Sequence, residues 1–418
     1  ATGEWEMALD CVDNMEWEIM HLGFVSNGNA RFYTRMQTPN FSHSVRMVSE
    51  KFGEAALVRY LPALEREYQH HMAGQAELPE FVEGEAQAAK CVIRMPDGSI
   101  LNRYWDEGEG PRLESYKEDV EMGALVVKGL TGAVREQRLR KFYKDVRAGA
   151  AWSWDYSSVM FEDGANFETI NATDLASLQL NCLMTDSEET LAAAYSAKAK
   201  VADPLEAVWC EEKAAQYREM AESRKAAIRK YCWDPKDKIF RDYNFVKDEQ
   251  TQSESIAMVY PLYIGMTNKE ETFGVAQALR DRYLKVGGFV TTLVETGEQW
   301  DGDNVWAPPN WAATRGLARM AHVLLEQGIE AAEVEELFEL AERGRAGYMH
   351  AVETAHRLFG MLPEKMNGKN PTQLAGGGEY ALVKVLNMTI ETYNAMKAWS
   401  PRETGGCLPI GRLALGRS

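Results

Sequence analysis

Long segments with a helical spacing of apolar residues recur along this chain, and they constrain its fold more than any other feature. Such segments span residues 4–20, 44–69, 186–201, 204–231, 309–327 and 331–358. Apolar residues recurring every three or four positions are typical of helices with one buried face. We expect about eleven helices arranged in successive pairs. The pattern predicts an all-α toroid of helical hairpins and argues against a parallel sheet built from alternating strands and helices.

Local signals place some of the helix ends and turns. Asp186 precedes Glu189 by three residues, an arrangement that satisfies free amides at a helix N-terminus, so we expect a helix to begin there. Pro204 stands where a proline is tolerated in the first turn of the next helix. Residues 233–243 and the turn at 95–98 are flanked by short apolar pieces. These segments predict small β-hairpins in the loops.

The charge balance excludes some classes of partner. The 418 residues include 63 acidic and 46 basic side chains, which gives a formal net charge of −17. A field of this sign repels phosphate backbones and anionic lipids, so we expect no nucleic-acid binding and no membrane insertion. No apolar run approaches the roughly 20 residues of a membrane-spanning helix. The first residues show no secretory signal and no initiator Met, so they do not indicate a cellular location.

Cysteine spacing argues against a metal centre. The six cysteines lie at positions 11, 91, 182, 210, 232 and 407, and no two form a CxxC pair. No histidine spacing completes a zinc site with them. We interpret them as scattered thiols and predict no metal ligands.

Three polar loops carry the residue types that bind sugars. Aromatic rings cover the apolar faces of a pyranose, while amides, carboxylates and guanidinium groups hold its hydroxyls. The loop at 152–158 places Asp155 between aromatic residues, where poor solvation would raise its pKa; a helix-capping Asp is the alternative. The loop at 299–311 contains three tryptophans, including Trp300, and we interpret it as a sugar-binding loop; a packed connection before a helix is the alternative. The third loop comprises residues 363–367 and 375–380 and contains Glu364 and a triple glycine, which would let the backbone approach a ligand closely; a flexible linker is the alternative.

Motifs in one order along the chain resemble those of the α,α-trehalases of glycoside hydrolase family 37. Residues 299–308 are similar to one of the family's two signatures except at Asp303, where the family has Pro. Residues 24–29 and 35–39 resemble "IPNGN" and "RSQPP", residues 101–106 and 111–116 resemble "NRYWD" and "PRPES", and residues 147–158 resemble "RAGAESGWDFSS". Gly287-Gly288 to Thr292, Glu364-Lys365 and Gly376–Tyr380 complete the series. The resemblance covers roughly residues 1–380.

The resemblance implies a fold, a reaction and a set of site residues. The fold would be an (α/α)6 barrel, and the reaction would be hydrolysis of trehalose to two glucoses with inversion. Asp155 corresponds to the family's general acid and Glu364 to its general base. The sugar-binding positions correspond to Asn27, Arg35, Gln37, Arg112, Glu114, Trp300 and Glu379. Two carboxyl groups about 6.5–9.5 Å apart leave room for the attacking water in an inverting glycosidase. The family implies no metal and no cofactor.

Several positions depart from the family pattern. The second signature, a Gly-Gly-Arg-Phe stretch that supplies sugar contacts and the first helix, is absent and would precede Ala1. Val159 replaces an Arg, Trp152 and Ser153 replace smaller residues beside the acid, and Met366-Asn367 follow the base. Residues 384–389 replace the family's "GFGWTNG". We expect Trp152 to narrow the pocket beside the acid, and the first helix of the barrel to be missing.

Two functional hypotheses follow from these matches and departures. The first is a glycoside hydrolase acting on trehalose or a related glucoside. The second is a degenerate, inactive trehalase-like subunit with a structural or interaction role in a larger assembly. In both, residues 1–400 form one N-terminally incomplete barrel domain and residues 401–418 a loose tail. We expect an upstream segment or a protein partner to complete the barrel.

Overall fold

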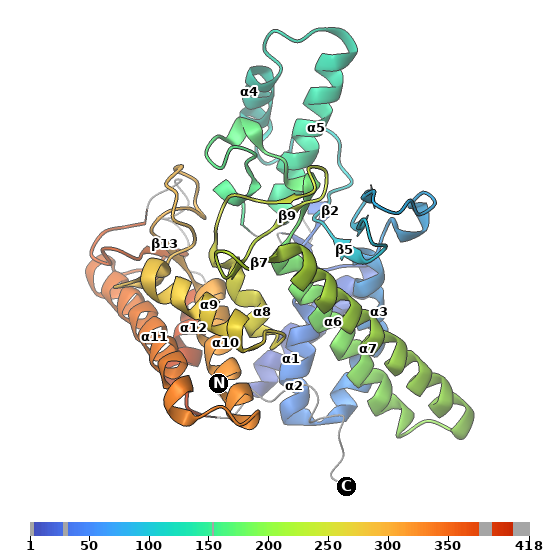
Figure 1. The fold of residues 1–418 in the computed structure, drawn as a ribbon, viewed down its shortest axis with the longest axis vertical. Coiled ribbons are helices and arrows are strands. Elements are labelled where there is room, and N and C mark those ends of the chain that lie inside the picture. Colours follow the sequence, from blue (N-terminus) through green and yellow to red (C-terminus); the bar gives the residue numbers. More distant parts are fainter. Residues whose placement is uncertain (1–3, 28–31, 153, 376–386, 404–418) are drawn as a thin grey trace. The chain divides into compact units, whose positions relative to one another are not determined.

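The computed structural model describes residues 4–27, 32–152, 154–375 and 387–403, and in these ranges the chain is mainly helical (Figure 1). They contain twelve α-helices, numbered α1 to α12. The chain divides into two compact units. Unit 1 comprises residues 1–8, 232–241 and 254–418, and unit 2 comprises residues 9–231 and 242–253. The single domain expected over residues 1–400 stays a prediction.

Unit 2 contains most of α1 and the next six helices. They are α1 (Trp5–Leu22), α2 (Phe41–Phe52), α3 (Glu54–His71), α4 (Tyr116–Val126), α5 (Gly132–Ala151), α6 (Leu178–Ala199) and α7 (Pro204–Cys232). Helix α6 packs against α2 and α3, and α4 packs along α5. Pro204 is the first residue of α7, as its position in the sequence predicts.

Two helix boundaries differ from the sequence-based expectation. The segment at 44–69 forms two helices, because Gly53 adopts a φ of +79° and ends α2 before α3 begins. The helix expected to begin at Asp186 begins at Leu178, and Ser177 is its N-cap. Asp186 is buried inside α6 and forms an ion pair with Arg46, so it is not a capping residue.

The core of unit 2 contains a buried ionic network. Arg224 on α7 donates from Nε and Nη2 to the Glu188 carboxylate on α6 at 2.8–3.1 Å. Its Nη1 donates to Asn102 Oδ1 at 2.7 Å and to Asn181 Oδ1 at 3.0 Å. Because Asn102 ends a strand, the network fixes the start of the loop that follows it.

The strands of unit 2 are short and lie in loops between helices. They are β1 (Ser26–Asn27), β2 (Phe32–Met36), β3 (Gln87–Ala89), β4 (Val92–Arg94), β5 (Ile100–Asn102), β6 (Leu175–Ala176), β9 (Tyr243–Asn244) and β10 (Glu249–Gln250). Strands β3, β4 and β5 form one antiparallel sheet in that order, and β10, β9 and β6 form another. The turn at 95–98 joins β4 to β5, as predicted.

Unit 1 is built around a pair of long helices. Its helices are α8 (Tyr260–Tyr263), α9 (Lys269–Ala278), α10 (Ala307–Glu326), α11 (Ala331–Phe359) and α12 (Asn387–Ala398). Helices α10 and α11 pack closely, and α12 packs against both. The pair corresponds to the segments predicted at 309–327 and 331–358.

Three antiparallel strand pairs complete unit 1. They are β7 (Trp233–Asp234) with β8 (Ile239–Phe240), β11 (Leu284–Lys285) with β12 (Gly288–Phe289), and β13 (Asn304–Trp306) with β14 (Lys365–Asn367). The β7–β8 hairpin is the one predicted within residues 233–243. The β11–β12 hairpin rests on α11 at glycines: a Cβ on Gly344 would lie 2.1 Å from the Phe289 ring.

Among the described helices, none is both long and apolar enough to cross a membrane. Most of the tail predicted at 401–418 falls outside the described residues, because the description ends at 403.

Candidate active site

Asp155 lies in the loop that follows α5. Trp152 caps the helix, and its backbone N–H donates to the carbonyl oxygens of Ala148 and Gly149. The side chains on either side of Asp155, Trp154 and Tyr156, are buried, and Asp155 itself is half-buried. The loop therefore places Asp155 between two residues with buried rings and leaves part of Asp155 accessible.

Trp152, at the end of α5, is buried. Its side chain is 1% exposed and stacks on Tyr104, with ring centroids 5.2 Å apart and an interplanar angle of 24°. The bulky ring is thus part of the packed interior of unit 2. The expectation that it narrows the pocket beside Asp155 stays a prediction.

Arg112 is buried just before α4, and its guanidinium is held on one side by Asp119. Arg112 Nε lies 3.2 and 3.0 Å from Asp119 Oδ1 and Oδ2, and Nη2 lies 2.7 Å from Oδ1. The guanidinium also lies over the Tyr156 ring, 5.2 Å from its centroid. Burial alone would lower the pKa of Arg112, but the Tyr156 and Asp119 interactions raise it, so this group stays charged.

Arg35 and Glu114, two predicted sugar-binding residues, form an ion pair. Arg35 Nη2 lies 2.6 Å from Glu114 Oε1, and the two side chains are 4% and 29% exposed. Burial would raise the pKa of Glu114, but hydrogen bonds from the backbone and Arg35 and the charges of Arg35 and Arg112 lower it overall. Glu114 is therefore an ionised acceptor that keeps contact with solvent.

Asn27 is the last residue of β1, and Gln37 directly follows β2. The Asn27 side-chain amide donates to the carbonyl oxygen of Ala150 in the last turn of α5, at 3.1 Å. The backbone N–H of Gln37 donates to the carbonyl of Val25 at 2.9 Å. The Asn27 contact ties this pair to the end of the helix that leads to Asp155.

Tyr156 lies under the Arg112 guanidinium and directly follows Asp155 in the chain. Burial raises the pKa of its phenol, the positive charges of Arg112 and Arg35 oppose that rise, and the charge of Asp155 adds to it. The Tyr156 hydroxyl donates to the carbonyl of Val146 on α5 at 2.7 Å. The buried ring is thus anchored to α5 through its hydroxyl and covered by the Arg112 guanidinium.

In unit 1, Trp300 precedes β13 by four residues and Glu364 immediately precedes β14. Trp300 stacks on Trp306, with centroids 3.9 Å apart and rings within 5° of parallel. Trp306 in β13 pairs with Lys365 in β14, which brings Glu364 to the strand start beside this stack. Lys365 is 1% exposed, and its Nζ lies 5.7 Å from the Trp306 ring centroid.

The loop that carries Trp300 is held by side-chain bonds. Buried Asp301 accepts hydrogen bonds from the hydroxyls of Thr292 and Thr296 at 3.0 and 2.6 Å. The Trp306 indole N–H and the Asn304 amide both donate to the carbonyl of Gln299. These hydrogen bonds hold the segment with the two stacked tryptophans in place. Half-buried Glu364 immediately precedes β14, the strand that pairs with β13.

The remaining predicted residues are placed as follows. Glu379 and the triple glycine before it lie outside the described residues. Asp155 belongs to unit 2 and Glu364 to unit 1. The sequence analysis assigned no role to Asp119, or to Trp306 and Lys365 within the motifs that contain them. The one signal for Asp119 is an acidic residue seven positions after Arg112, in the first turn of a helix.

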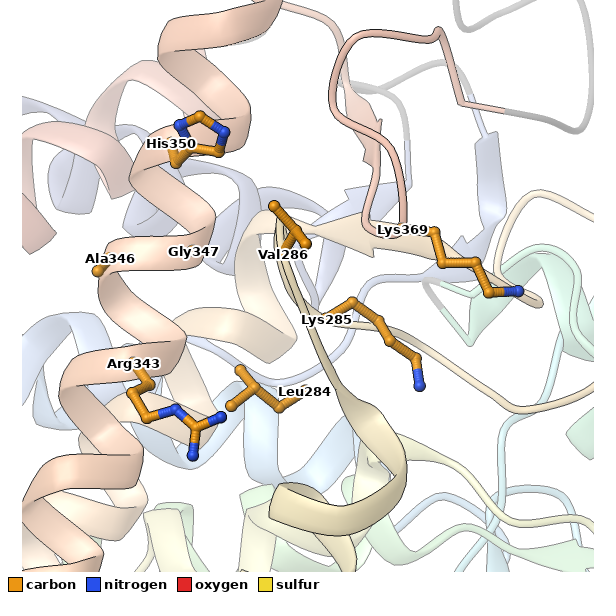
Figure 2. Close-up of a pocket in the computed structure, with 8 residues that line it drawn as sticks. All are labelled: Leu284, Lys285, Val286, Arg343, Ala346, Gly347, His350 and Lys369. Atoms are coloured by element: carbon orange, nitrogen blue, oxygen red, sulfur yellow. The ribbon is translucent and has the colours of Figure 1, made fainter.

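A separate pocket of about 640 Å³ lies on unit 1, between α11 and the β11–β12 hairpin (Figure 2). Its lining includes Lys285, Arg343, His350 and Lys369, and it contains none of the predicted site residues. Lys285 Nζ donates to the carbonyl of Arg282 at 2.7 Å, and Lys369 Nζ lies 2.8 Å from Asp303 Oδ2. Both lysines already have partners, so this pocket is not the candidate active site.

Comparison with known proteins relates the chain to trehalases. The trehalase family model matches residues 1–384. Periplasmic trehalases of Xanthomonas axonopodis pv. citri (strain 306) and Xanthomonas oryzae pv. oryzae (strain MAFF 311018) are each 33% identical over 382 residues, which is 91% of this chain. The chain spans 60% of the length of these relatives.

Solved structures agree with this relationship. Neutral trehalase Nth1 from Saccharomyces cerevisiae is similar with a TM-score of 0.64 at 21% identity, over 96% of this chain and 70% of that one. A GH63 mannosylglycerate hydrolase from Thermus thermophilus in complex with Tris has a TM-score of 0.52 at 13% identity, over 94% of this chain and 90% of that one. At these identities the likeness shows the fold, and it confirms the predicted (α/α)6 barrel fold. With the family model matched over most of the sequence, the chain belongs to the trehalase family.

Proposed function

We propose that this protein is an inverting glycoside hydrolase that cleaves trehalose into two glucose molecules. The single observation that carries the proposal is a pair of linked contacts in unit 2: Arg35 pairs with Glu114 at 2.6 Å, and Arg112 lies over the ring of Tyr156, the residue that follows Asp155. Family membership and the names of the Xanthomonas relatives support trehalose as the substrate.

In this proposal Asp155 is the general acid. A carboxyl that protonates a leaving group must hold its proton near neutral pH, which partial burial between aromatic rings favours. Asp155 has such neighbours in Trp154 and Tyr156. Its accessible part leaves it able to reach the glycosidic oxygen.

Glu364 is the general base that activates the attacking water. It immediately precedes β14, and that strand is paired with β13 in fixed register. Glu364 is half-buried, which leaves room for a water molecule at its carboxylate. A base and an acid on opposite sides of the sugar produce inversion at the anomeric carbon.

The sugar is held by charged and planar groups. Ionised Glu114 accepts hydrogen bonds from sugar hydroxyls, and Arg35 and Arg112 donate hydrogen bonds to hydroxyl oxygens. In this proposal the buried Trp300, stacked on Trp306, forms an aromatic wall of the sugar site. Asn27, Gln37 and Glu379 supply further polar contacts in this proposal.

The direct test is proton NMR of trehalose mixed with the protein. The proposal predicts that β-glucose appears first from the α-linked substrate and then mutarotates. Early release of α-glucose alone would contradict inversion and the role of Glu364 as base. No glucose release by the protein would contradict the hydrolase proposal and favour an inactive trehalase-like subunit.

A further inference from the structure

The guanidinium of Arg112 is held by a residue that none of the family motifs includes. Asp119 lies in the first turn of α4, and its carboxylate is 3% exposed. It accepts the backbone N–H of Arg112 at 2.7 Å in addition to the bonds from Nε and Nη2. One buried carboxylate therefore fixes both the main chain and the side chain of Arg112.

This arrangement leaves one side of the guanidinium available. An Arg has five N–H donors in a planar fork, and Asp119 occupies the edge formed by Nε and Nη2. The Nη1 donors lie on the other side of the fork. The Arg112 side chain is 11% exposed, so its guanidinium is accessible to a ligand.

Tyr156 supports the face of the guanidinium. The guanidinium lies over its ring, and the ring is anchored by the hydroxyl bond to Val146. The ring also lies close against α5, since a Cβ on Gly149 would be 2.7 Å from it. Arg112 is thus fixed from the edge by Asp119 and from the face by the residue that follows Asp155.

We propose that Asp119 is a positioning residue for sugar binding, which acts by holding Arg112 in the orientation that presents its Nη1 edge to a sugar hydroxyl. This inference rests on the proposed function, because it assumes that Arg112 binds the substrate. Groups that orient a binding residue matter because a displacement of about 1 Å costs on the order of 10²-fold in catalytic efficiency.

The test is steady-state kinetics on trehalose with Asp119→Asn, Arg112→Met and the double variant. Asn keeps the size of Asp119 but presents an amide N–H₂ and no charge to the guanidinium. We expect Asp119→Asn to raise KM by about 10- to 100-fold, with a smaller change in kcat. In the Arg112→Met background, the same substitution should change kcat/KM less than about twofold, because its effect passes through Arg112.

The matched control is Asp145→Asn. Asp145 is equally buried in unit 2, and its hydrogen-bonding partners are Lys141 and Thr173, neither of which contacts the sugar in the proposed function. The substitution should lower thermal stability by an amount similar to Asp119→Asn and leave KM unchanged. If both variants raise KM alike, the effect of Asp119 is general destabilisation and the inference is wrong.

The remaining outcomes separate the two proposals. If Arg112→Met raises KM but Asp119→Asn does not, the positioning role is wrong and the proposed function stands. An equal loss from Asp119→Asn with and without Arg112 also overturns it. If Arg112→Met leaves both KM and the calorimetric affinity for trehalose unchanged, Arg112 does not bind the sugar, and the proposed site fails together with this inference.

Discussion

Replacing Arg224 by Met should destabilise unit 2 strongly. Arg224 is 3% exposed, and its hydrogen bonds reach Glu188, Asn102 and Asn181 at 2.7–3.1 Å. The substitution leaves the 1% exposed Glu188 carboxylate buried, with the Tyr68 hydroxyl, 2.9 Å away, as its polar partner among the described residues. Removing one member of a buried ion pair costs about 3–5 kcal/mol of unfolding free energy.

The assay is urea unfolding followed by tryptophan fluorescence. Arg218→Met on the same helix is the control, because Arg218 is 47% exposed, and we expect it to change stability by less than about 0.5 kcal/mol. The double variant Arg224→Met/Glu188→Met should be at least about 1 kcal/mol more stable than Arg224→Met alone, since no buried charge is left unpaired. A loss below about 1 kcal/mol for Arg224→Met, or simple additivity in the double variant, would refute this reasoning.

Three further predictions concern pH, packing and the stacked tryptophans. Burial raises the pKa of Glu67 to about 8 in the folded state, so the stability that protonated Glu67 contributes is present at low pH and is lost as pH rises toward 8. The unfolding free energy of Glu67→Gln, measured against pH, should lack this decline, and a profile identical to that of the wild type would contradict the prediction. Gly344→Ala should cost about 1–3 kcal/mol in thermal unfolding, because the added methyl meets the buried Phe289 ring; unchanged stability would show that the ring moves freely. Trp300→Ala should weaken trehalose binding in calorimetry by about 5- to 10-fold through loss of the stack on Trp306, and wild-type affinity would remove Trp300 from the site.

The sequence predicts helices well where their ends carry local signals. Pro204 starts α7, and the segments at 309–327 and 331–358 form α10 and α11. It fails at α6, where Asp186 looks like an exposed cap but is buried against Arg46. Acidic residues are seldom buried, and a partner about 140 positions away leaves no local trace in the sequence.

The site shows the same division. Ordered motifs identify Arg35, Arg112 and Glu114, yet they do not reveal that Arg35 and Glu114 pair with each other. Asp119 is missed because its relation to Arg112 depends on the angle at which α4 starts. Burial and pairing are properties of the folded chain, so residue types and spacing alone do not determine them.

The central claim, that Asp155 and Glu364 are the acid and base of a trehalose hydrolase, is tested most directly by glucose release from trehalose. Asp155→Asn and Glu364→Gln are near-isosteric, and each should lower kcat by at least about 10²–10⁴-fold with folding retained. Asp163→Asn and Glu353→Gln are matched controls, because Asp163 lies in an exposed loop and Glu353 on the exposed side of α11. We expect both controls to keep wild-type rates. Full activity in Asp155→Asn or in Glu364→Gln would contradict the assignment.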